Sequence, residues 1–199
     1  MSENQRRFLE ELFEVSVKAA DPLHCLAPYL PQKPAGRTIV LGAGKAAASM
    51  AKAVENVWGG DVEGLVVTRY DHGLGLDQIE VVEAAHPVPD VAGMDAARRI
   101  YELACSADEN DLVLCLMSGG ASSLLSLPGG NLELSHKQSV NKALLKSGAN
   151  ITEMNCVRKH LSAIKGGRLA LAAYPAKVVT LGISDIPGDD PATIGSGPS

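Results

Sequence analysis

The chain has 199 residues, of which 46% are hydrophobic and 21% are charged, a composition typical of a folded globular protein rather than a disordered one. The formal net charge of −5 gives no overall attraction to nucleic acid or to an anionic membrane, so anion binding must depend on local groups. The four cysteines lack C-x-x-C spacing, and neither a signal peptide nor a membrane-spanning apolar stretch is recognisable. These features predict a reduced, cytoplasmic protein with no nucleic-acid or membrane partner.

Helices and strands are expected to alternate along most of the chain. Apolar residues at helical spacing predict a helix over residues 5–20, which Asp21-Pro22 should end. The other expected elements are strands at 37–41, 64–68, 79–84, 111–117 and 177–183, and helices at 45–57, 91–106, 135–147 and 152–173, the last bent at Gly166-Gly167. This alternation predicts an α/β domain over residues 1–199, with a mainly parallel sheet covered by helices on both faces.

The first glycine-rich turn, Gly42-Ala43-Gly44-Lys45, lies between a buried strand and an alanine-rich helix. Backbone N–H groups and the helix dipole at such a turn attract anions, and the cation of Lys45 reinforces the attraction. The spacing also matches the looser dinucleotide fingerprint, but the acid that would bind a ribose is missing, because Arg69 and Tyr70 follow the next strand. A tight turn that only packs the helix against the sheet is the alternative interpretation.

The second glycine-rich turn, Ser118-Gly119-Gly120-Ala121-Ser122, follows the clearest buried strand. Its two glycines would let a ligand approach the backbone, and its serines would add hydroxyl donors. A serine-capped helix start is the alternative. Since ligands bind beyond the carboxyl ends of parallel strands, we expect these two turns and the loop after Ile183 to converge on one edge of the sheet.

A basic segment runs from Asn155 to Arg168. At helical spacing Asn155, Arg158 or Lys159, Ser162 and Lys165 would share one side of a helix. Such a run is usually a solvated charged face. Here the positive charges lack interleaved acids, and their repulsion favours a nearby anion.

Acidic residues follow the last predicted strand. Asp185, Asp189 and Asp190 suit magnesium, which prefers a few carboxylates together with substrate phosphates. Helix caps and turn formers are the common alternative for aspartates in such a loop. The rigid loop His86-Pro87-Val88-Pro89-Asp90 ends another strand and says little by itself.

Together these segments resemble the glycerate 2-kinase family of bacteria and archaea, whose members are often labelled hydroxypyruvate reductases. The matching stretches run in order over nearly the whole chain, at residues 40–46, 86–90, 117–122, 147–149, 153–162, 165–167, 184–190 and 196–198. The resemblance implies ATP-dependent phosphorylation of D-glycerate at its 2-hydroxyl to 2-phosphoglycerate, with Mg²⁺. It also implies a Rossmann-like three-layer α/β/α domain that faces a second, C-terminal domain.

Family chains are about twice as long. The chain is therefore expected to be an incomplete, C-terminally truncated N-terminal domain that is inactive alone. An apolar surface that the missing C-terminal domain would cover could also make it a homo-oligomer.

The resemblance also suggests roles for individual residues. Lys45 matches the active-site lysine of the family and would bind the transferring phosphate or the glycerate carboxylate. Arg158 would add catalytic charge, and Asp185 is the candidate base for the glycerate hydroxyl. The expected nucleotide-binding residues are Gly42, Gly44, Ser118, Gly119, Gly120, Ser122, Asn155, Lys159 and Lys165, and the expected magnesium ligands are Asp189 and Asp190.

Two other functions fit the same residues. An NAD(P)H-dependent hydroxypyruvate reductase would use the first turn for its dinucleotide, with Arg69 suited to a 2′-phosphate. A non-catalytic fragment that binds a phosphorylated metabolite is the other alternative. Protection against heat by NADPH or by ATP would separate the two enzymes, and binding without product would indicate the third.

Overall fold

Five strands form one parallel sheet in the computed structural model, which describes residues 1–199 apart from the side chain of Ile151. The sheet order is β3-β2-β1-β4-β5. The strands are β1 (Thr38–Ala43), β2 (Glu63–Arg69), β3 (Ile79–Ala84), β4 (Leu112–Ser118) and β5 (Lys177–Ile183). An all-parallel sheet needs cover on both faces, and the continuous apolar runs of β1 and β4 fit that requirement.

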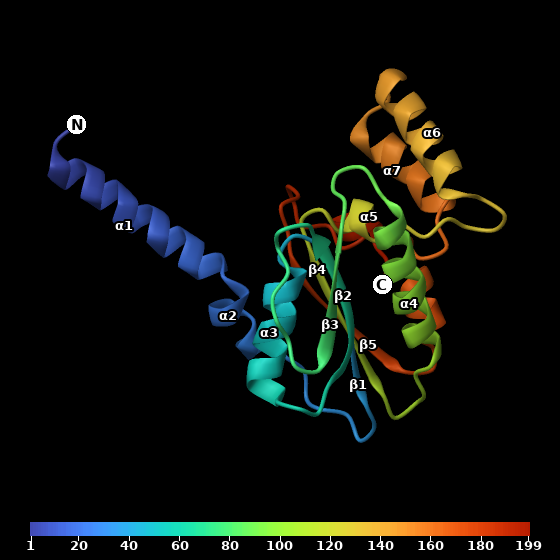
Figure 1. Cartoon of the computed structure of the whole chain (residues 1–199), viewed down its shortest axis with the longest axis horizontal. Coiled ribbons are helices and arrows are strands. Elements are labelled where there is room, and N and C mark those ends of the chain that lie inside the picture. The colour runs from blue at the N-terminus through green and yellow to red at the C-terminus, as the bar shows by residue number, and fades with distance from the viewer.

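Helices cover both faces of this sheet (Figure 1). On one face α3 (Ala47–Trp58) packs against alternate strand residues such as Val40 and Leu114. On the other face α4 (Val91–Cys105) and α8 (Arg168–Ala172) pack against Leu41 and Val113. The predicted three-layer α/β/α architecture is therefore confirmed, and the two cores are separated by the sheet itself.

The N-terminal helix α1 (Glu3–Ala20) projects away from this body (Figure 1), and α2 (Pro22–Cys25) and η1 (Ala27–Tyr29) lead from it to β1. A capping box joins Ser2 to Gln5 at its start, and Asp21 ends it as predicted. None of its residues is buried, so its apolar side chains, including Phe8 and Phe13, are exposed. No described helix is long and apolar enough to cross a membrane.

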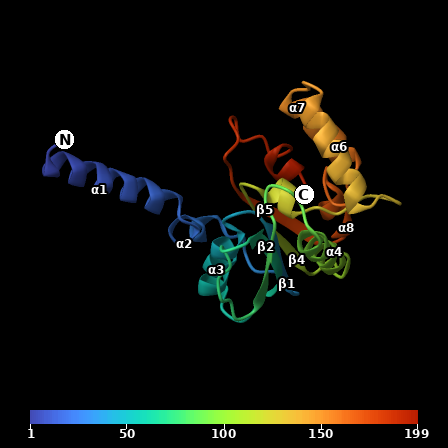
Figure 2. The ribbon, with the colours of Figure 1, turned by 45° about the horizontal axis from the view of Figure 1, so that its top comes forward.

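Three helices gather beyond the carboxyl ends of the strands (Figure 2). They are α5 (Ala121–Leu124), α6 (Leu134–Lys146) and α7 (Ile151–His160), and the last two form a helical hairpin. The loop after β5, which includes η2 (Ile194–Ser196), lies at the same end.

The single bent helix expected over 152–173 is wrong, because the chain forms α7 and α8 with a loop between them. Segment 161–163 pairs with segment 127–129, where the Gly129 N–H donates to the Leu161 carbonyl (3.1 Å). Gly166 and Gly167 then adopt left-handed φ angles of 64° and 79°, which a continuing helix excludes. Ser162 and Lys165 therefore do not share a helical face with Asn155 and Arg158.

A smaller correction concerns the first turn. Gly42 and Ala43 belong to β1, and α3 begins at Ala47 rather than at Lys45. Lys45 is consequently a turn residue, free of the helix that follows. Gly59 is the C-cap of α3, and Asp90 is the N-cap of α4, where its side chain accepts from the Gly93 N–H.

Candidate functional site

The turns after β1 and β4 are joined by hydrogen bonds. The backbone N–H of Lys45 donates to the Gly119 carbonyl (2.9 Å), and the N–H of Ala46 donates to the Ser118 hydroxyl (3.0 Å). These bonds form because β1 and β4 are neighbours in the sheet and both end at this edge. The two glycine-rich turns thus converge as predicted.

Glycine is required where these turns meet. A Cβ atom at Gly44 would lie 2.1 Å from the Ser118 hydroxyl oxygen, and φ is +132° there. A Cβ atom at Gly119 would lie 2.4 Å from a carboxylate oxygen of Asp185 and 3.4 Å from Cε of Lys45. The small space beside Gly119 is therefore bordered by a cation and an anion, and the loop after β5 joins the same site.

His86 also reaches this site, and sequence reasoning gave it no role of its own. A Cβ atom at Gly120 would lie 2.9 Å from its ring. Burial, followed by the positive charges of Lys45 and Arg69, lowers the pKa of His86 below its usual value. The imidazole is consequently neutral at pH 7. The signal that could have found it is its position directly after β3, at the same edge of the sheet.

Lys165 is the most buried cation of the site, with 2% of its surface exposed. Its amine donates to the carbonyl (2.6 Å) and the hydroxyl (3.2 Å) of Ser122, whose hydroxyl also lies 2.7 Å from that of Ser196. Burial lowers the pKa of Lys165 well below its usual value, and the charges of Lys137, Arg158 and Lys159 lower it further. Lys165 therefore links the second turn to the end of the chain instead of facing solvent.

The basic residues of α7 are held by neutral oxygens. The guanidinium of Arg158 donates to the side-chain oxygens of Asn155 (3.3 Å) and Asn141. The amine of Lys159 donates to the carbonyl of Ala192, which ties α7 to the loop after β5. Arg158, Lys159 and Lys165 thus lie near one another as the sequence suggested, through the packing of separate segments rather than along one helix.

The three candidate acids have different surroundings, although all are exposed. Asp185 lies against Gly119, as described above. Asp190 accepts hydrogen bonds from the Thr193 hydroxyl (2.7 Å) and the Ala192 N–H (3.1 Å), and these bonds lower its pKa. Among the described residues, no group of three or more His, Cys, Asp or Glu side chains is placed to hold a metal ion.

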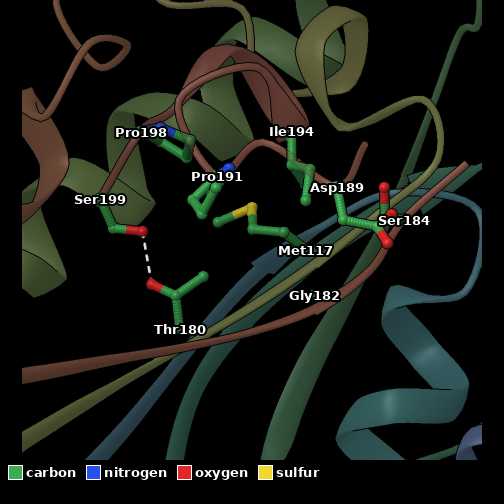
Figure 3. A pocket seen from close by; sticks show the side chains of 9 residues that line it. All are labelled: Met117, Thr180, Gly182, Ser184, Asp189, Pro191, Ile194, Pro198 and Ser199. Atoms are coloured by element: carbon green, nitrogen blue, oxygen red, sulfur yellow. Dashed lines mark hydrogen bonds between the residues drawn. The ribbon is translucent and has the colours of Figure 1, made fainter. Parts of the chain in front are cut away.

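A pocket of about 460 Å³ opens beside β5 (Figure 3). Met117 and Ile194 give it an apolar side, Ser184 and Asp189 lie together at one end, and Thr180 bonds Ser199 (2.5 Å) at the other. Asp189 is the one expected site residue among the described residues that line it. The lining of this pocket includes none of Lys45, Gly119 and Asp185.

Chemically, this edge of the sheet offers backbone donors, cations and one carboxylate at glycine-lined turns. Such an arrangement is typical of parallel α/β domains, in which anionic ligands bind beyond the carboxyl ends of the strands. The chain belongs to the family described as "Domain of unknown function (DUF4147)", whose model matches residues 8–199.

Named relatives of this chain include kinases. It is 45% identical to the D-glycerate 2-kinase of Thermotoga maritima, an alignment that covers 99% of this chain and 48% of the relative. It is 53% identical to an Agrobacterium vitis protein named "Putative hydroxypyruvate reductase", in an alignment that covers 98% of this chain and 44% of that protein. The crystal structure of glycerate kinase from Thermotoga maritima superposes with a TM-score of 0.91, at 44% identity, over 99% of this chain and 48% of that one.

These comparisons confirm the resemblance to the glycerate 2-kinase family. The chain spans about half the length of the curated relatives it matches.

Proposed function

We propose that this chain forms the N-terminal half of an enzyme that transfers phosphate from ATP to the 2-hydroxyl of D-glycerate. The observation that carries the proposal is the position of Lys45, whose side chain borders the space beside Gly119 together with Asp185. Phosphoryl transfer needs charge neutralisation and positioning more than covalent chemistry, and this space provides both. The name of a relative at 45% identity, a D-glycerate 2-kinase, supports the same reaction.

In this proposal the two turns position the transferring phosphate. Lys45 neutralises its negative charge, and backbone N–H groups of the second turn (118–122), together with the hydroxyl of Ser122, donate to its oxygens. Gly42 and Gly44 keep the first turn (42–45) close enough for these contacts. Asp185, beside Gly119, accepts the proton of the glycerate hydroxyl, and the neutral His86 lies beside the neighbouring Gly120.

The basic residues would bind the rest of the nucleotide. Arg158 and Lys159 carry half-buried positive charge on α7, and Asn155 accepts a hydrogen bond from Arg158. We assign Lys165 a positioning role instead of the direct ligand contact that the sequence suggested, because its amine is buried against Ser122.

Magnesium fits this chemistry when the nucleotide supplies most of its ligands. Mg²⁺ usually takes one or two protein carboxylates with phosphate oxygens and water, so a cage of three acids is not required. Asp189 and Asp190 would hold it, with Asp185 close to the phosphate; Asp190 keeps one lone pair per oxygen beyond its bonds to Thr193 and Ala192. When bound, the ion would neutralise charge on the phosphates.

The experiment uses a chimaera in which residues 1–199 replace the matching half of the Thermotoga maritima kinase. With ATP, Mg²⁺ and D-glycerate, the folded chimaera should form a phosphoglycerate and should be protected against heat by ATP. Protection by NADPH with reduction of hydroxypyruvate would instead support the reductase. Protection by ATP without any product would support a binding fragment.

The setting of the enzyme is also a proposal. The four cysteines are all free, which suits the reducing cytoplasm predicted for the chain. The exposed apolar side chains of α1 are consistent with another domain or a second copy as partner.

A further inference from the structure

Four cations meet between the α6–α7 hairpin and the second turn. Lys137 comes from α6, Arg158 and Lys159 from α7, and Lys165 from the loop before α8. The first three lie close enough to Lys165 for their charges to lower its pKa. We call these four residues the cation cluster. Sequence analysis did not single out Lys137, because its proximity depends on how the hairpin packs.

Every hydrogen bond that the cluster side chains donate goes to a neutral oxygen. Arg158 uses the amide oxygens of Asn141 and Asn155, and Lys159 uses the carbonyl of Ala192. Lys165 uses Ser122 and the Gly195 carbonyl. Neutral acceptors fix the positions of these side chains without supplying a compensating negative charge, so the attraction of the cluster for an anion is not cancelled.

Lys137 is the least satisfied member. It is half-buried, and its amine makes one long contact (3.4 Å) with the Leu127 carbonyl. That carbonyl already accepts the Ala163 N–H (3.0 Å) and the Ser162 hydroxyl (3.2 Å). Burial lowers the pKa of Lys137 to about 8, which reflects the cost of a desolvated ammonium without a counter-ion. An anion at this point would remove that cost.

Acids do not balance the cluster. Among the described residues, no carboxylate lies within 4 Å of any of its four cationic groups. The acid whose pKa responds to the cluster is Asp190, through Lys159, and its oxygens already accept from Thr193 and Ala192. Like charges at short range repel, so the arrangement favours a ligand with several negative charges over a single carboxylate.

We propose that Lys137, Arg158 and Lys159 bind the oligophosphate chain of a nucleotide, with buried Lys165 as a positioning residue behind them. The identification of the ligand as a nucleotide rests on the proposed function; the oligophosphate chemistry rests on the cluster alone. Ser122 connects this subsite to the second turn, since Lys165 bonds its carbonyl and hydroxyl. The phosphate chain would therefore run from the cluster toward Lys45, which leaves the Lys45 side for the acceptor.

Inorganic triphosphate is the probe, and calorimetric titration of residues 1–199 is the measurement. Lys137→Met keeps the length of the side chain and removes the charge, and should weaken binding about ten-fold or more. Lys146→Met is the matched control, because Lys146 lies about two and a half turns further along α6; it should bind like the unmodified chain. Thermal melting monitors the fold of both variants.

Equal binding by the folded Lys137→Met variant and the unmodified chain, or no triphosphate binding by the unmodified chain, would overturn the subsite. The same substitution in the chimaera separates this proposal from the proposed function. If triphosphate binding depends on Lys137 while the chimaera forms no phosphoglycerate, the subsite stands and the kinase assignment fails. If the chimaera is a kinase whose KM for ATP does not change on Lys137→Met, the subsite fails and the kinase assignment stands.

Discussion

The backbone N–H of Lys45 donates a 2.9 Å hydrogen bond to the carbonyl of Gly119, and this bond joins two turns that are 74 residues apart in sequence. It fixes the start of the Lys45 side chain relative to the space beside Gly119, although the side chain itself is exposed. The position of the charge is thus set by the backbone of two neighbouring strands. Substitutions in the backbone of the two turns should therefore move the Lys45 charge, whereas substitutions of the Lys45 side chain should remove it.

Lys45→Ala should leave the fold intact and remove the proposed activity. The side chain is exposed and belongs to neither core, so the melting temperature should change little. In the chimaera we expect turnover to fall by about a hundred-fold or more, because the charge on the transferring phosphate is no longer neutralised. Lys18→Ala on α1 is the control, because Lys18 is also an exposed lysine. Near-normal turnover of Lys45→Ala would show that the first turn only packs α3 against the sheet.

Gly44→Ala should destabilise the chain because of both sterics and backbone strain. The added Cβ atom would lie 2.1 Å from the Ser118 hydroxyl, at a φ of +132° that other residues rarely adopt. We expect a loss of about 2–4 kcal/mol in the free energy of unfolding, measured with urea. Gly75→Ala is the control, since nothing lies within 4 Å of its added Cβ atom; equal stability of the two variants would contradict this account of the turn.

Asp111→Asn should destabilise the fold, because the Asp111 carboxylate, just before β4, binds Arg37 and Asp108. Burial alone would raise the pKa of Asp111, but hydrogen bonds from the backbone N–H groups of Arg37 and Asp108 and from the Arg37 guanidinium outweigh it and lower the pKa. We expect the substitution to cost about 2–3 kcal/mol at pH 7, because it weakens the pairing of a buried carboxylate.

The pH dependence of that cost follows from the direction of the shift. A carboxylate with a lowered folded-state pKa contributes stability above its unfolded value of about 3.8, and this stability is lost as the pH falls through the folded value. The difference between the unmodified chain and Asp111→Asn should therefore shrink below about pH 4. A difference that stays constant from pH 7 to pH 3 would show that the charge of Asp111 is not what stabilises the fold.

Residues 1–199 alone should bind inorganic triphosphate and turn over no D-glycerate. The donors of the two turns and the cation cluster all belong to this chain, whereas phosphoryl transfer requires a closed site that excludes water. The measurement is calorimetric binding beside a phosphorylation assay on the same sample. Turnover at a rate typical of kinases, roughly 1–100 per second, would show that this half contains the whole catalytic apparatus.

The sequence predicted the fold well because its signals are local. Continuous apolar runs predicted β1 and β4, and the glycine-rich turns marked where both strands end. Neighbouring parallel strands then necessarily bring those turns together, so the meeting of Lys45 and Gly119 could be predicted without coordinates. The same argument could have placed His86 in the candidate site, because His86 follows β3 at the same edge of the sheet.

Other features depended on contacts that no local pattern contains. The chain after His160 leaves the helix because segment 161–163 pairs with segment 127–129. That pairing turns Lys165 inward, to a carbonyl and a hydroxyl of Ser122. Lys137 joins the cluster only through the packing of α6, and one lysine at helical spacing on a polar helix carries no signal of its own.

The position of the transferred phosphate is the most direct test of the central claim. The chimaera is supplied with ATP, Mg²⁺ and D-glycerate, and its product is passed to enolase, which uses 2-phosphoglycerate and not the 3-isomer. Our account predicts immediate conversion of the product by enolase, in a reaction that Lys45→Ala abolishes and Lys18→Ala does not. Exclusive formation of 3-phosphoglycerate, or oxidation of a nicotinamide cofactor with hydroxypyruvate in place of phosphate transfer, would contradict it.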